Sequence, residues 1–144
     1  MIFPFNLKYQ AHISNSAIFE NSDPAFVYLK NEFTHLRVNN FSTKKDEMSF
    51  KNTFFNGQKG GHPLTIIDSG AIKYNKKSNA FVFSFSTLLA FIISIAMSLF
   101  MGFISENYVF GILAFCFLYG GNTCIAYYRL SSLTQKLKKN IERL

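Results

Sequence analysis

The chain has 144 residues, of which 49% are hydrophobic, and its formal charge is +7. About 75 residues precede two long apolar runs, enough for one small domain, and the chain outside the runs is too short to wrap them in a soluble fold. The charge divides as +4 before the runs, −1 between them and +4 after them. That division favours a membrane surface over nucleic acid as the partner of the basic residues.

The first part of the chain, residues 1–79, is predicted to form a small α+β domain with one helix on a short antiparallel sheet. Residues 3–12 alternate apolar and polar side chains, which is the two-residue period of a half-buried strand. A helix is predicted over residues 24–37, because Asp23 can cap it, Pro24 suits its first position, and apolar residues follow at helical spacing.

Further short strands are predicted over residues 48–55, 64–67 and 71–74. A glycine-rich segment, residues 56–63, separates the first two of them. It lacks the spacing of a phosphate-binding P-loop, since Lys59 is followed by glycine and the segment leads to a proline rather than a helix. We therefore interpret it as a connection between strands.

The end of this domain has two interpretations. Phe81, Phe83 and Phe85 alternate with smaller residues, as in a strand. Either the first apolar helix begins near residue 81, or residues 81–85 are a last strand and the helix begins near Ser86. In the second case the domain extends to residue 85 and joins the helix almost without a linker.

Two apolar runs, about residues 81–104 and 108–128, contain no Lys, Arg, Asp or Glu. Each is long enough to cross a bilayer as a helix, the conformation in which hydrocarbon leaves no backbone polar group unpaired. The short break between them makes the two helices antiparallel neighbours. The sequence therefore predicts a transmembrane helical hairpin over residues 80–128.

Basic residues flank both sides of this hairpin, whereas its connecting loop carries only Glu106. The positive-inside rule then predicts a multi-pass protein of the cell (inner) membrane, with both termini in the cytoplasm and Glu106 outside. The apolar amino terminus is short and broken by Pro4, so we do not interpret it as a signal peptide. The basic residues expected to meet anionic headgroups are Lys73, Lys76, Lys77, Arg129, Lys136, Lys138, Lys139 and Arg143.

Small residues recur at every fourth position of both predicted helices, a pattern that permits close helix packing in lipid. The two ridges consist of Ser86, Ala90, Ser94, Ser98 and Gly102 on the first helix, and Cys116, Gly120 and Cys124 on the second. Either the ridges pack against each other, or at least one of them docks a partner helix or a second copy. Asn122 and Thr123 are predicted to hydrogen-bond across a helix interface.

Residues 129–144 predict a basic amphipathic helix, with an apolar strip that includes Leu130, Leu137 and Ile141. This tail has three conceivable positions: on the membrane, over the amino-terminal domain, or paired with another helix. Two heptads are short for a coiled coil, so we favour the first two.

No pattern points to catalysis, and we expect no enzyme, no cofactor and no metal site, because the histidines are scattered and no nucleophile stands beside a base. The expected function is that of a two-span accessory, adaptor or regulatory subunit. Its partners would be the anionic lipid bilayer and a membrane protein or a second copy, without nucleic acid. An oligomeric pore or small holin-like transporter, and a membrane-bound immunity protein against an exported toxin, remain as alternatives.

Overall fold

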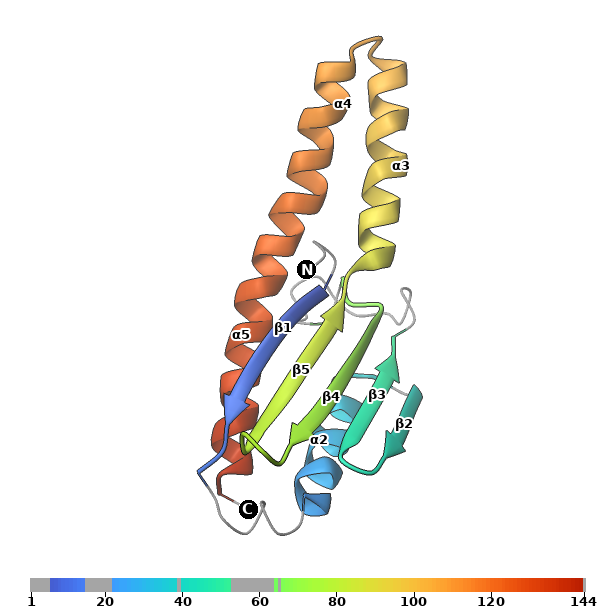
Figure 1. Ribbon diagram of the computed structural model, residues 1–144. Helices are drawn as coiled ribbons and strands as arrows, with labels where there is room; N and C mark the ends of the chain where they lie inside the picture. Colours follow the sequence, from blue (N-terminus) through green and yellow to red (C-terminus); the bar gives the residue numbers. More distant parts are fainter. Residues whose placement is uncertain (1–5, 15–21, 39, 53–63, 65, 144) are drawn as a thin grey trace.

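The computed structural model describes residues 6–14, 22–38, 40–52, 64 and 66–143. A five-stranded antiparallel sheet carries two helices on one face, and a helical hairpin rises from one end of the sheet (Figure 1). In spatial order the strands are β1 (Asn6–His12), β5 (Ala80–Ser86), β4 (Ser69–Asn75), β3 (Glu47–Lys51) and β2 (Asn40–Lys44). The helices are α2 (Asp23–His35), α3 (Leu88–Ile104), α4 (Tyr108–Phe115), the π-helical η1 (Cys116–Gly121) and α5 (Asn122–Ile141). The predicted α+β class is confirmed.

The core lies between one face of the sheet and the helices α2 and α5. On β5, Phe81, Phe83 and Phe85 all point to this face and are at most 1% exposed, as the two-residue period requires. Burying each such side chain contributes about 1.5–3 kcal/mol. The helices cover these rings with Phe26, Leu29 and Phe33 from α2, and with Leu130, Leu137 and Ile141 from α5.

The carboxy-terminal helix α5 is therefore part of the domain rather than a separate tail. Its Leu137 and Ile141 are fully buried, and its Asn140 side chain donates a hydrogen bond to the Tyr28 hydroxyl of α2 at 2.7 Å. Of the three positions considered for the tail, the structure has the one over the amino-terminal domain. Residue 129 marks no structural boundary, because segments before and after the hairpin share one core.

Of the two interpretations of residues 81–85, the structure has the second: they belong to a last strand, and the first apolar helix begins at Leu88 rather than near residue 81. Residues 80–86 pair with β1 on one side and with β4 on the other. The ladder hydrogen bonds and the buried phenylalanines outweigh the apolar character that made this segment resemble a membrane helix. Only Thr87 separates β5 from α3, so the sheet passes directly into the hairpin.

Other predictions for the domain differ in detail from the structure. Leu64 and Ile66 lie in turns rather than in a strand. Residues 1–5, the end of the predicted strand 48–55, and the glycine-rich segment 56–63 lie outside the described residues.

Within the described part of the chain, one helix is long and apolar enough to cross a membrane, namely the continuous helix Tyr108–Ile141. The helix α3 is apolar but has only 17 residues and falls short of that length. The predicted pair of spanning helices is thus supported for one helix. The shortfall of the other follows from the seven residues that it gives to β5.

Candidate functional site

Small residues form the seam where α3 and α4 meet near the tip of the hairpin. Ser94, Ser98 and Gly102 of α3 are buried, as is Gly111 of α4. A Cβ placed on Gly111 would lie 2.9 Å from the Ser98 carbonyl oxygen and 3.2 Å from the Gly102 Cα. The two backbones therefore approach too closely for any side chain at position 111.

This seam contains only part of the predicted first ridge. Ser86 lies in β5 rather than on α3, and Ala90 is only partly buried. Gly111, which makes the closest approach, was missed because it lies outside the four-residue series on the second helix. The sequence signal that could have identified this close approach is a glycine within an apolar run.

The second predicted ridge faces away from the seam, so the two ridges do not pack against each other. Cys116 and Cys124 are exposed, and a Cβ placed on Gly120 would meet nothing within 4 Å. The π-helical turn at residues 116–121 explains the difference, because its i→i+5 bonding changes which side chains share a face. A constant helical period therefore fails at this point of the chain.

The two polar residues after η1 do not bridge the hairpin either. The Asn122 amide donates to the Leu118 carbonyl of its own helix at 2.6 Å. The buried Thr123 hydroxyl oxygen has no hydrogen-bond partner within the described ranges. The prediction of an interhelical hydrogen bond is therefore wrong for Asn122.

Aromatic side chains join the two helices at the base of the hairpin. Phe91 of α3 packs against Phe115 and Tyr119 with ring centroids 5.8 and 5.1 Å apart, and the Tyr119 and Thr87 hydroxyls lie 3.2 Å apart and are buried. These contacts hold the start of α3 against the end of α4 and η1.

A second clamp joins the edge strand β1 to α5. The Tyr9 hydroxyl donates to the Tyr127 carbonyl at 2.9 Å, and the two rings lie 5.6 Å apart. Burial, together with the neighbouring Tyr127, raises the pKa of Tyr9 to about 12. The proton that this hydrogen bond needs is therefore retained well above neutral pH.

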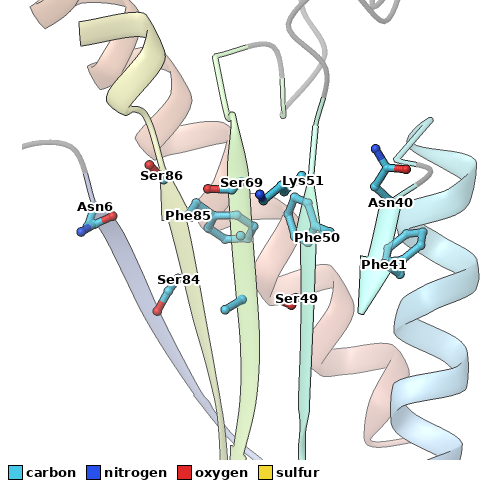
Figure 2. Close-up of a pocket in the computed structure, with 12 residues that line it drawn as sticks. Asn6, Asn40, Phe41, Ser49, Phe50, Lys51, Ser69, Ser84, Phe85 and Ser86 are labelled. Carbon is cyan, nitrogen blue, oxygen red and sulfur yellow. The ribbon is translucent and has the colours of Figure 1, made fainter. Parts of the chain in front are cut away.

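Polar side chains cover the opposite face of the sheet, which no described element overlies. An open depression of about 570 Å³ lies over the end of this face from which α3 departs, here called the hairpin end (Figure 2). Its open-face lining comes from all five strands: Asn6, Ser84, Ser86, Ser69, Ala71, Ser49, Lys51 and Asn40.

Asp68 closes the corner between this face and α3. Its carboxylate accepts a hydrogen bond from the Ser86 hydroxyl at 3.2 Å and a longer one from Ser69 at 3.5 Å, and its backbone N–H donates to the Ser86 carbonyl at 3.1 Å. The other carboxylate oxygen of Asp68 and the Asn52 side-chain oxygen are buried, and neither has a hydrogen-bond partner in the described part of the chain. Asp68 therefore ties β4 to β5 directly below the hairpin.

Most of the basic residues predicted to meet lipid lie far from the hairpin. Lys76 and Lys77 occupy the β4–β5 turn, about 20 Å along β5 from α3, and Lys73 pairs with Glu47 at 3.2 Å. On α5, Lys136, Lys138, Lys139 and Arg143 begin about 12 Å beyond Tyr128, whereas Arg129 follows it directly. The Debye length is about 8 Å at physiological salt, so only Arg129 stays within reach of a surface at the hairpin base.

In the residues that the structure describes, no group of three or more His, Cys, Asp or Glu could hold a metal ion. His12 and His35 are exposed at opposite parts of the domain, and His62 lies outside the described residues. Comparison of the chain with protein-family models, curated proteins and solved structures finds no match. The function is therefore argued from the geometry alone.

Proposed function

We propose that this chain is a two-span integral membrane protein that serves as an accessory or adaptor subunit, and that a partner's transmembrane helix docks on its second apolar helix. The observation that carries the proposal is the open face formed by Cys116, Gly120 and Cys124. In an exposed helix each glycine costs up to about 1 kcal/mol relative to alanine, and no packing among the residues that the structure describes requires Gly120. Close approach of a helix from another protein would account for it.

The outer surface of the hairpin supports insertion into lipid. Phe103 and Phe117 are 82% and 81% exposed, and they belong to a continuous apolar surface that a soluble monomer rarely shows. Tyr108 and Tyr128 are exposed and lie about 30 Å apart along the helix axis. That spacing matches the hydrocarbon thickness, and tyrosines are enriched at both of its interfaces.

The shared core supports two crossings rather than one. A single crossing would place the sheet and the end of α5 on opposite sides of the membrane, although they pack together. The 17 residues of α3 span about 25 Å, and a deficit of this size can be met by local thinning of the bilayer. The basic flanks then favour a cytoplasmic domain, because orientation is decided by charges near the helix ends during insertion.

A reporter at the hairpin tip tests this topology. Alkaline phosphatase inserted at Glu106 is expected to be active, because the tip lies outside the cytoplasm, and the same enzyme fused after residue 144 is expected to be inactive. The φ of 50° at Glu106 marks a tight turn that a flexible linker can extend without entering either helix. An inactive reporter at Glu106, with the fusion protein present in the membrane fraction, would contradict two crossings.

Replacing Gly120 with leucine tests the docking surface. We expect the protein to unfold at a temperature no lower than that of the wild type, because leucine has the higher helix propensity. Recovery of a co-purifying membrane partner is expected to fall at least about tenfold, because a 1.4 kcal/mol loss in docking suffices for that factor. The matched control is Ala96→Leu, which enlarges an exposed small residue on α3 outside both ridges. Undiminished partner recovery with Gly120→Leu, or purification of the wild-type chain alone as a monomer, would count against the adaptor.

A further inference from the structure

The open face of the sheet has a trough at its hairpin end. Ser84 and Ser86 of β5 and Ser69 and Ala71 of β4 lie side by side in the register and form a floor of short side chains. Longer side chains stand on the flanking strands, with Lys8 on β1 and Lys51 on β3. Three strand spacings separate β1 from β3, so the trough is about 14 Å wide.

This trough is basic. The open-face positions of the five strands carry Lys8, Lys44, Lys51 and Lys73 against Glu47, and the Asp68 carboxylate lies at the hairpin end of the floor, which leaves an excess of two positive charges. Glu47 pairs with Lys73, whereas within the described ranges no ion pair holds Lys8 or Lys51. The face therefore complements an anion.

Hydrogen-bond donors accompany the two lysines. The side chains of Asn6 and Ser84 line the depression. Ser69 and Ser86 give their hydroxyl protons to Asp68, so they offer only lone pairs to a ligand. The groups that line the trough and can meet an anion are thus the Lys51 ammonium, the Asn6 amide and the Ser84 hydroxyl, and the Lys8 ammonium lies beside Ser84 in the strand register. The Asp68 carboxylate lies at the hairpin end, so an anion is expected nearer to Ser84.

The trough also has a direction. Val82 and the Lys73–Glu47 pair occupy the next row and close its far end. Its other end reaches Ser86, two residues before α3 begins, as the stick view shows (Figure 2). An anion held here would lie at the depth where the hairpin leaves the domain.

We propose that this trough binds the phosphate of an anionic phospholipid headgroup. The inference rests on the proposed membrane function, because only an inserted hairpin brings lipid to this end of the sheet. A single-stranded nucleic acid fits less well, since Phe41, Phe50 and Phe85, which line the depression, pack in or against the core and are not free to stack on a base. Headgroup binding would also fix the rotation of the domain against the bilayer.

Lipid exchange measures this binding. The full chain is placed in phosphatidylcholine nanodiscs, and binding of a fluorescent phosphatidylglycerol is titrated. Charge near the surface contributes about 1 kcal/mol per basic residue, so the Lys8→Gln and Lys51→Gln variants are each expected to bind about fivefold more weakly. Ser84→Leu fills the floor without changing charge and is expected to weaken binding as well.

The control is Lys136→Gln with Lys139→Gln, which removes two exposed charges at the far end of α5 and should leave binding unchanged. An equal loss of binding in this control would contradict the assignment of the lipid site to the trough. Full binding by Ser84→Leu at an unchanged unfolding temperature would contradict it as well. Complete displacement of the lipid by inorganic phosphate would identify a free anion as the ligand and overturn the lipid assignment. If the Glu106 reporter is exported but no phosphatidylglycerol preference is found, this inference alone fails.

Discussion

Replacing Gly111 with alanine is expected to lower the unfolding temperature of the protein in mild detergent. The added Cβ would lie 2.9 Å from the Ser98 carbonyl oxygen and 3.2 Å from the Gly102 Cα, and both are backbone atoms that cannot swing aside. Overpacking of this kind typically costs about 1–3 kcal/mol. We expect the loss to appear as a downward shift of the thermal transition followed by circular dichroism.

Gly120→Ala is the matched control, because it makes the same change in the same continuous helix where a Cβ meets nothing within 4 Å. Alanine there should stabilise the helix by up to about 1 kcal/mol through its higher propensity. If both variants lose stability equally, chain flexibility rather than close packing explains the two glycines. The seam at Gly102 and Gly111 would then carry less of the hairpin's stability than the geometry indicates.

The parts of the fold that follow a local period could be predicted from the sequence. The predicted amphipathic helix and the apolar face of the tail both appear in the structure, although the helix begins at Asp23 and Ser22 rather than Asp23 is at its N-cap position. Residues 81–85 show where a local period is ambiguous, because a strand buried on one face and flanked by apolar residues resembles the start of a membrane helix. Pairing with β1 and β4 makes this segment a strand rather than a helix, and the pairing involves residues that are distant in sequence.

The docking surface around Gly120 and the basic trough could not be predicted from local sequence periods. The π-helical turn at residues 116–121 places Gly120 away from the seam, and the four-residue spacing of the small residues does not predict that turn. The basic residues were placed at the membrane by their distance along the chain, yet β5 and α5 carry most of them away from the hairpin. Lys8 and Lys51 lie 43 positions apart in sequence and face one trough only because the register of five strands brings them there.

One structural relation governs both the topology and the stability of the protein. The chain leaves the domain at Thr87, forms the hairpin, and returns through η1 to complete the core with α5. The domain therefore cannot finish folding until the second apolar helix has been made and α5 has returned to the sheet. Contacts between α5 and the sheet thus couple folding of the domain to completion of the hairpin.

Replacing Leu137 with alanine is expected to destabilise the whole domain. Leu137 is fully buried against the sheet and α2, and truncating such a side chain typically costs about 2–5 kcal/mol. Urea unfolding of the detergent-solubilised chain, followed by circular dichroism, should show a clearly lower midpoint. The neighbouring Lys136 is exposed, so Lys136→Ala should leave the midpoint within about 0.5 kcal/mol. An unchanged midpoint for Leu137→Ala together with weaker binding to vesicles would instead place this helix on the membrane surface and contradict the shared core.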